Sequence, residues 1–308
     1  MKPKLYFFGA DCRLSFLVLK QLCERRLGMI RAVYSPAPAK DDGLRNLPVT
    51  TRGSETELAR LGLEYDIPCL TRQPPACPGS PAQAHESLLL SVCYPRRLPT
   101  RLLSQFSLAV NLHPSMLPAY RGPAPLFWQL RDDRRQIGVT LHHLDSDLDT
   151  GPVCLQQPLD LAADDMLETI EHKIASLGVQ LIGQLITLYA NDRPIPSTAQ
   201  STLGSASYQG FPKAQDYIIP CNWTATHAYR FTRGATAFTR QLPFQLQCDK
   251  TRFHLGAASA LAPRLAGTGS TSYVIDSEKN LRIQFADASV VFDSSNYRFG
   301  ARDTPFGA

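Results

Sequence analysis

The chain has 308 residues, enough for one large domain or two ordinary ones with a sizeable core. Its hydrophobic share of 44% and charged share of 19% are those of a globular protein rather than a disordered one. The net charge of +5 permits an anionic ligand, but no Lys/Arg block concentrates that charge, so the signal for nucleic-acid binding is weak.

Strand-like and helix-like segments alternate along the first part of the chain. We expect strands at residues 5–8, 29–34, 88–93, 108–112 and 137–144, and helices at 14–25, from the Ser54-Glu55-Thr56-Glu57 capping box to near Asp66, and onward from Asp165. This alternation predicts an α/β fold with a Rossmann-like, mostly parallel sheet and helices on both faces.

The composition changes near residue 190, where a Pro/Ser/Thr/Gly-rich stretch follows the last long apolar helix. We therefore expect a first domain over residues 1–190, a linker over 191–205 and a second domain over 206–308 with a loose tail. The second domain is predicted to be a small α+β unit with one short helix at 224–232, stopped by Gly234. Its strands are expected near 244–248, 272–275, 281–285 and 289–292.

The eight cysteines form no C-x-x-C pair, and several lie in apolar segments, as buried thiols do. Scattered unpaired thiols favour a reducing compartment. The N-terminal residues lack a signal-peptide core. No apolar run reaches the length of about 18 residues that a membrane span needs. We expect a soluble cytoplasmic protein without a membrane partner.

The most informative stretch is Asn-Leu-His-Pro-Ser-Met-Leu-Pro at residues 111–118, followed by Tyr-Arg-Gly at 120–122 and Leu-Asp-Thr-Gly at 148–151. Asn111 and His113 end a strand that we expect to be buried, and reacting groups gather at the carboxyl ends of such strands. Side chains two residues apart on a strand share a face. An amide donor and an imidazole would thus converge, as acyl transfer requires.

Two neighbouring patterns imitate metal sites. Residues 145–149 resemble the start of a calcium loop, but the required Gly falls one place late and Gln156 stands where a chelating Glu belongs. His142 and His143 beside these aspartates suggest zinc, but neighbours on a strand point to opposite faces. We therefore expect no metal.

The combined motif resembles that of the folate-dependent formyltransferases. This superfamily includes methionyl-tRNA formyltransferase, glycinamide ribonucleotide formyltransferase and the bacterial sugar N-formyltransferases. The resemblance is strongest over residues 88–160 and weaker over 1–190, and it extends into the second domain as a small open barrel. It implies transfer of a formyl group from 10-formyltetrahydrofolate to a primary amine.

The resemblance implies a role for each residue of the motif. Asn111 would donate a hydrogen bond to the formyl oxygen as it becomes an oxyanion. His113 would stabilise that oxyanion or take the proton of the attacking amine, and Asp149 would orient His113, hold a water and assist proton transfer. Taken singly, each residue has a plainer explanation, as a turn former, a core histidine or a turn aspartate. Their order and spacing together favour the catalytic one.

The resemblance also implies where the folate binds. The loop that carries Tyr94, Arg96 and Leu98 would grip the pterin mainly through its backbone, and Asp145 and Asp147 would lie on the opposite wall. Arg96 has two interpretations, as a contact to the folate's glutamate tail or as a solvated surface residue.

The acceptor is the more open question. By the same resemblance, Asp11, Ser115 and Arg121 are expected on the acceptor side. Phe127-Trp128 looks more like the sugar-modifying relatives, whereas the two-domain length suits the tRNA enzymes. The loop at residues 38–46 has zero net charge, a poor footprint for phosphates.

A small-molecule amine such as an amino sugar is therefore favoured over initiator tRNA. A formyltetrahydrofolate hydrolase and a non-catalytic folate-binding protein remain as alternatives. The sequence sets no oligomeric state.

Overall fold

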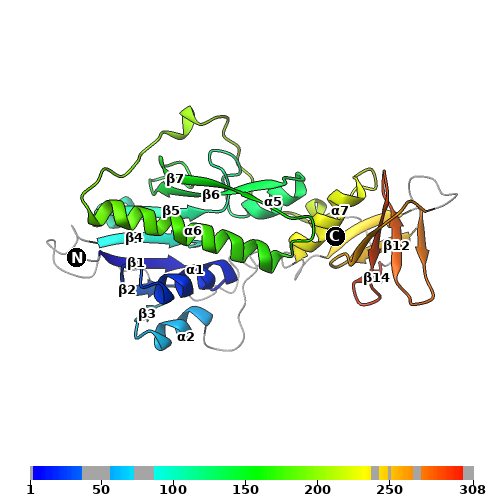
Figure 1. Cartoon of the computed structure of the whole chain (residues 1–308), viewed down its shortest axis with the longest axis horizontal. Helices are drawn as coiled ribbons and strands as arrows, with labels where there is room; N and C mark the ends of the chain where they lie inside the picture. The colour runs from blue at the N-terminus through cyan, green and yellow to red at the C-terminus, as the bar shows by residue number, and fades with distance from the viewer. Residues whose placement is uncertain are drawn as a thin grey trace. The chain divides into compact units, whose positions relative to one another are not determined.

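The structure is a computed structural model that describes residues 3–36, 56–72, 87–236, 243–248, 251–265 and 272–300. The chain divides into two compact units (Figure 1). The first comprises Met1–Pro125, Gln136–Asp160 and Glu171–Gly210, and the second comprises Leu126–Arg135, Leu161–Ile170 and Phe211–Ala308. Two short segments of the N-terminal part, Leu126–Arg135 and Leu161–Ile170, thus belong to the second unit. The segment expected as a linker, residues 191–205, belongs to the first.

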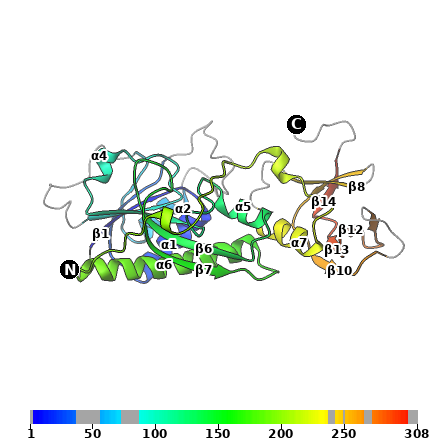
Figure 2. The ribbon, with the colours of Figure 1, turned by 90° about the horizontal axis from the view of Figure 1, so that it is seen from above.

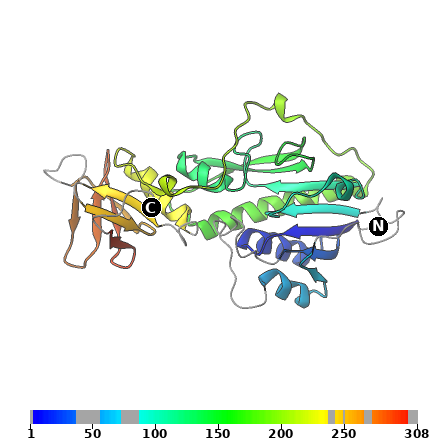
Figure 3. The same ribbon diagram turned by 180° about the vertical axis from the view of Figure 1, so that it is seen from behind.

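A seven-stranded sheet forms the centre of the first unit, in the order β3-β2-β1-β4-β5-β6-β7 (Figure 3). Its strands are β1 (Lys4–Gly9), β2 (Met29–Tyr34), β3 (Cys69–Leu70), β4 (Ser87–Val92), β5 (Leu108–His113), β6 (Gln136–His143) and β7 (Val153–Asp160). The strands from β3 to β5 in this order pair in parallel, and β6 and β7 extend the sheet antiparallel at one edge. The prediction of an α/β fold with a mostly parallel sheet is confirmed.

Helices pack on one face of this sheet (Figure 2). They are α1 (Arg13–Glu24), α2 (Glu57–Glu64), which packs beside α1, and most of α6 (Leu167–Ala190). The Gln21 side chain of α1 donates to the Ser176 hydroxyl of α6 at 3.4 Å. A Cβ atom added at Gly178 would lie 2.9 Å from Leu112, so the absence of a side chain there lets α6 approach β5 closely.

The opposite face is covered by the chain between β4 and β5, which contains the one-turn helix α4 (Thr100–Leu103). Side chains of this segment pack against alternate residues of β1, β2 and β4. The buried cluster consists of Tyr6, Phe8, Ala32, Tyr34 and Leu89 from the sheet, and Leu98, Leu102, Leu103 and Phe106 from the covering segment. Helices on both faces are confirmed, although among the described residues this second face carries only the short α4.

Helix α6 is, among the described residues, long and apolar enough by composition to cross a membrane, with half of its most apolar window buried in the structure. Its buried positions include Ile170, Ile174, Leu177, Leu181 and Leu185, which recur at three- and four-residue spacing. That periodicity is typical of a helix that packs one face against a protein core.

Two helix starts differ from the sequence-based expectation. Thr56, not Ser54, caps α2, because its hydroxyl accepts the N–H of Ala59 at 3.1 Å; Ser54 lies outside the described residues. Helix α6 begins two residues after Asp165, whose carboxylate instead accepts the N–H of Ala162 at 2.8 Å.

Strand β7 and helix α5 (Pro125–Arg131) are not among the elements expected from the sequence. Strand β7 contains Pro158, which lacks an N–H and is tolerated because β7 lies at the edge of the sheet. Helix α5 is only two turns long, too short for a clear apolar period, and its Pro125 occupies the first helical position, where no N–H bond is needed.

The second unit combines α7 (Ala225–Gly234), capped by the Thr224 hydroxyl, with two small antiparallel sheets. One has the order β10-β13-β12-β11 and the other β14-β9-β8. Their strands are β8 (Phe244–Cys248), β9 (Thr251–Leu255), β10 (Ala260–Ala262), β11 (Tyr273–Ile275), β12 (Leu281–Gln284), β13 (Ser289–Phe292) and β14 (Tyr297–Phe299). The short 3₁₀ helices are η2 (Gln200–Thr202) in the first unit and η3 (Ala214–Tyr217) in the second.

Aromatic packing holds α5 in the second unit. Phe127 is fully buried, and its ring contacts those of Tyr217 and Phe231 at centroid distances of 5.2 and 5.5 Å. Arg131 of α5 also donates to the carbonyl of Ile218 at 3.2 Å. Phe127 is thus a core residue of the second unit, so its presence carries information about packing rather than about the acceptor.

The seven cysteines within the described residues are all free thiols. Cys77 lies outside them. The expected reducing compartment stays a prediction.

We expect Phe127→Ala to lower the free energy of unfolding of the second unit by about 3–5 kcal/mol, because it removes a fully buried ring. Denaturant unfolding followed by tryptophan fluorescence measures this directly, since Trp128 and Trp223 are the chain's two tryptophans and both belong to that unit. Phe299→Ala is the control, because that ring is 59% exposed and its removal should cost far less. Equal midpoints for the two variants would contradict the packing argument.

Candidate active site

The antiparallel pairing of β5 with β6 builds one side of the site. Asn111 on β5 lies directly opposite His142 on β6, and its Nδ2 atom is 3.1 Å from His142 Nε2. His142 Nδ1 is 2.9 Å from the carbonyl oxygen of His143, so the ring donates there and accepts the amide N–H through Nε2. This bond orients the Asn111 amide and leaves its second N–H for another acceptor.

His113 occupies the last position of β5 and is 4% exposed. Its Nε2 atom is 2.8 Å from the carbonyl oxygen of Tyr120, an acceptor only, so Nε2 carries the proton of the neutral ring. Nδ1 then presents a lone pair and lies 3.5 Å from Asp149 Oδ1. Both ring nitrogens therefore face an acceptor oxygen, and a doubly protonated ring could donate to both, so this environment can receive a proton.

Opposing influences set the pKa of His113. Burial lowers it below its ordinary value, while the Asp149 carboxylate and the Tyr120 carbonyl act in the raising direction and His142 in the lowering one. Burial is the largest of these and prevails. His113 is therefore a neutral base near neutral pH, beside a carboxylate that stabilises its protonated form.

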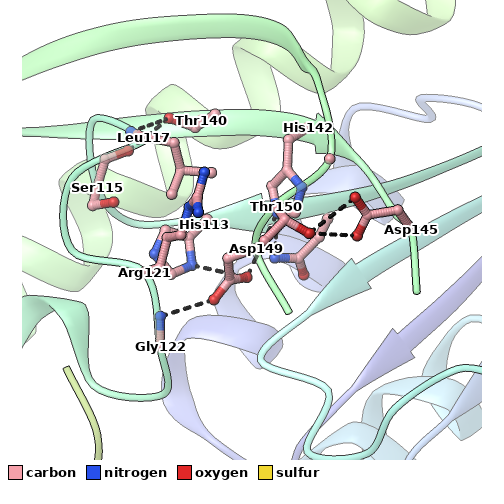
Figure 4. Close-up of polar contacts among 12 residues, drawn as sticks. His113, Ser115, Leu117, Arg121, Gly122, Thr140, His142, Asp145, Asp149 and Thr150 are labelled. Atoms are coloured by element: carbon pink, nitrogen blue, oxygen red, sulfur yellow. Dashed lines mark hydrogen bonds and ion pairs between the residues drawn. The ribbon is translucent and has the colours of Figure 1, made fainter. Parts of the chain in front are cut away.

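Asp149 joins the two histidines (Figure 4). Its Oδ1 atom lies 3.5 Å from His113 Nδ1 and 3.6 Å from His142 Nε2, and its Oδ2 accepts the N–H of Gly122 at 2.9 Å. Burial alone raises the pKa of Asp149, but the two histidines and the Gly122 N–H together hold it well below its usual range. Asp149 is thus a carboxylate at every physiological pH.

The turn between His113 and Gly122 is fixed by buried hydrogen bonds. The Ser115 hydroxyl donates to the Ala119 carbonyl at 2.7 Å, and the Thr140 hydroxyl of β6 donates to the Ser115 carbonyl at 2.7 Å. Ser115 is fully buried. Its hydroxyl therefore shapes the turn, and the acceptor contact that we expected for it stays a prediction.

The residues expected around the folate fall into two groups. Tyr94 and Leu98 pack on the same buried cluster as Leu144, and their contact with the folate stays a prediction. The Tyr94 ring lies edge-on to Phe8, with centroids 5.3 Å apart. Arg96 is exposed, and no described hydrogen bond fixes its guanidinium.

The loop beyond Leu144 has its own internal contacts. Both carboxylate oxygens of Asp145 lie 2.9 Å from the Thr150 hydroxyl, and Oδ1 also accepts the Asp147 N–H at 3.2 Å. Asp147 itself is exposed. A cavity of about 520 Å³ lies on this side of the sheet, lined by Leu103, Phe106, Ala109, Leu144 and Asp145 among others.

The remaining two residues expected near the acceptor lie apart in the fold. Asp11 follows β1, is 5% exposed and accepts the Glu57 N–H at 3.1 Å through Oδ1, while Oδ2 is buried with no partner within the described structure. Burial raises the pKa of Asp11. Arg121 adjoins Gly122 and donates to the Gln200 side chain, so it lies beside Asp149.

Two residues of the site were not recognised in the sequence. The sequence suggests His142 only as a zinc ligand, because its position opposite Asn111 depends on a strand register that the sequence does not display. Gln200 lies in a segment with linker composition, and no motif signals it. Across the described ranges, no group of three His, Cys, Asp or Glu residues is placed to hold a metal ion.

The chain is similar to known formyl transferases. A family model described as formyl transferase matches residues 74–186. A methionyl-tRNA formyltransferase of Synechococcus elongatus is 27% identical over 236 residues, covering 75% of this chain and 69% of the relative.

Two solved structures share the fold over nearly their whole length. The sugar 3N-formyl transferase WlaRD, solved with dTDP and 5-N-formyl-THF, has a TM-score of 0.64 at 15% identity, with 95% of this chain and 97% of that one covered. The N-formyltransferase of Helicobacter canadensis, solved with folinic acid and dTDP-3-aminofucose, has a TM-score of 0.60 at 17% identity, with coverage of 95% and 99%.

We expect the imidazole of His113 to titrate below the ordinary value of 6.5, because burial lowers its pKa. Replacing Asp149 with Asn removes a charge that raises this pKa, so the titration should move still lower. Histidine NMR titration of the folded protein measures both values. Asp145→Asn is the matched control, since that carboxylate contacts Thr150 rather than a histidine. A rise in the His113 pKa in the Asp149→Asn variant would refute this arrangement.

Proposed function

We propose, on the premise that this chain belongs to the formyltransferase superfamily, that it transfers the formyl group of 10-formyltetrahydrofolate to the primary amine of a small molecule. The observation that carries the proposal is the convergence of Asn111, His113 and Asp149. A donor for an oxyanion, a neutral buried base and a permanently charged carboxylate meet within one cluster. Folate-dependent formyl transfer needs these three groups and no resident metal.

The chemistry follows from the partners of each side chain. Attack of an amine on a formyl carbon places negative charge on the formyl oxygen and positive charge on the nitrogen. Asn111 has one N–H bonded to His142 and a second N–H to meet that oxygen. A preorganised donor of this kind contributes about 3–4 kcal/mol to transition-state stabilisation in known cases.

Proton removal uses the other half of the cluster. The lone pair on His113 Nδ1 accepts the proton that the attacking nitrogen loses, directly or through a water, and the imidazolium then donates to Asp149 and to the Tyr120 carbonyl. General base catalysis of this type contributes about 10²–10⁴-fold to a rate. The same proton returns to the leaving nitrogen of the donor.

The donor site is proposed at the two walls formed by the Tyr94–Leu98 loop and Leu144–Asp147. The packing of Tyr94, Leu98 and Leu144 on one buried cluster and the cavity lined in part by Leu144 and Asp145 support it, since apolar walls with a few polar groups are typical of ligand sites. Both similar structures were solved with a formylated folate, which further supports this choice.

A small amine, of the amino-sugar kind, is the acceptor that we favour. The fold likeness to two sugar N-formyltransferases supports it, as does Asp11 Oδ2, which has no hydrogen-bond partner among the described residues and offers an acceptor atom to an amine or hydroxyl. Initiator methionyl-tRNA is the second candidate, because the sequence similarity to methionyl-tRNA formyltransferase extends over 75% of this chain.

The acceptor is tested by a panel of amino sugars, other small amines and initiator methionyl-tRNA. The protein is supplied with 10-formyltetrahydrofolate, and tetrahydrofolate release is followed. Release that depends on one amino sugar supports the proposal, whereas release only with the tRNA, together with steeply salt-dependent binding, supports the second candidate. Release at full rate without any acceptor indicates a hydrolase, and no release under any condition contradicts enzymatic function.

His113→Ala and Asp149→Ala should each reduce turnover by about 10²-fold or more while folate binding stays near that of the wild type, because both act on the proton rather than on the donor. Steady-state rates and donor binding by calorimetry separate the two effects. His172→Ala is the control for His113, since His172 is exposed on α6. Near-native turnover in either active-site variant would remove that residue from the mechanism.

A further inference from the structure

The segment over residues 196–209, here called the strap, has the composition of a linker but is bonded to both loops of the active site. It follows α6 and runs past β7 and β6 in the first unit (Figure 1). Thr198 and Val153 exchange both backbone hydrogen bonds, at 2.8 and 2.9 Å. Farther along, the Ser207 N–H donates to the Pro118 carbonyl at 3.1 Å. The strap thus spans from the Asp149 loop to the turn that precedes Gly122.

One side chain of the strap faces inward. Gln200 is 4% exposed and is the single buried residue between positions 191 and 210. Its Nε2 donates to the carbonyl oxygens of Asp149 and Gly151, both at 2.8 Å. Its Oε1 accepts from Nε and Nη2 of Arg121, at 3.0 and 2.6 Å. Every hydrogen-bonding capacity of this amide is therefore used.

These contacts hold Asp149 from two directions. Its backbone has φ of 59°, a left-handed conformation that costs a residue with a side chain some free energy and persists where neighbours enforce it. Gln200 binds the loop at two carbonyls, that of Asp149 itself and that of Gly151 two residues later. Arg121, the other partner, precedes Gly122, whose N–H binds the Asp149 carboxylate.

We infer that Gln200 is a positioning residue of the active site, which fastens the Asp149 loop to the Arg121–Gly122 turn so that the Asp149 carboxylate lies against His113 and His142. The inference rests on the proposed function for Asp149. It places a determinant of turnover outside the catalytic motif, in the strap. The Gln200 amide is suited to this task because it offers two donors for carbonyls and one acceptor for a guanidinium.

The first test is Gln200→Met, which keeps the length of the side chain but removes both donors and the acceptor. We expect kcat to fall by about 10- to 100-fold, the effect of a catalytic group displaced by about 1 Å, with little change in the KM for the folate. Ser201→Ala, at the exposed next residue, should leave both constants unchanged. Wild-type kcat in the folded Gln200→Met variant would overturn the inference.

A second readout separates positioning from general destabilisation. If Gln200 acts through Asp149, Gln200→Met should add almost nothing to the loss caused by Asp149→Asn, because the double variant has no carboxylate left to position. Losses that multiply in full would show that Gln200 acts by another route and would overturn the inference.

A third readout needs no turnover. Displacement of the Asp149 carboxylate should lower the His113 pKa in Gln200→Met toward its value in Asp149→Asn, measured by histidine NMR. An unchanged His113 pKa counts against positioning. If Asp149→Asn keeps native turnover while Gln200→Met still shifts this pKa, the proposed function of Asp149 fails and the positioning role stands.

If Gln200→Met does not fold, Gln200→Glu takes its place. This variant keeps the contact to Arg121 but turns a carboxylate oxygen toward the carbonyls of Asp149 and Gly151. We expect it to lose turnover as Gln200→Met does, because the donors are the part that holds Asp149. Native kcat in this variant would contradict the inference, since the strap would then need only its bond to Arg121.

Discussion

The buried carboxylate of Asp149 is the group on which the rest of the site depends. A charge taken out of water is costly unless hydrogen bonds and opposite charge replace its hydration. Here the Gly122 N–H donates one such bond to the carboxylate at 2.9 Å, and the two histidine rings, at 3.5 and 3.6 Å, supply opposite charge when they are protonated. The same neighbours keep Asp149 ionised and give His113 a partner for the proton that it receives. The stability of the loop and its chemistry are thus two consequences of one arrangement.

The antiparallel edge of the sheet makes this arrangement possible. Strand β6 runs antiparallel to β5, and this register places His142, near the carboxyl end of β6, directly opposite Asn111. His143, the next residue, faces the opposite side, and its ring contacts the Pro196 carbonyl. A register slip by one residue would exchange the two rings and break the Asn111 contact. The pairing of β5 with β6 therefore acts on the catalytic geometry as well as on the fold.

The division of the chain into units does not follow its composition. The segment at 191–210 is rich in residues that are common in flexible linkers, yet it bonds through its backbone and through Gln200 to the first unit. Helix α5 lies within the N-terminal part of the sequence, yet Phe127 is buried among aromatic rings of the second unit. Composition describes what a segment can do in isolation, whereas membership in a unit depends on which surfaces it meets.

The sequence by itself determined the α/β class, the main strands of the sheet, the long helix α6 and the motif residues Asn111, His113 and Asp149. These follow from local information, because apolar periodicity, caps and a spaced motif can be recognised without knowledge of distant contacts. Only the tertiary structure decided the role of His142, the neutral state of His113 and the contacts of Gln200. Each of these depends on a strand register, on burial or on a hydrogen bond that joins residues 31 to 79 positions apart. Such pairings arise when the whole chain folds, since no local pattern specifies which distant group will pair with a given donor or acceptor.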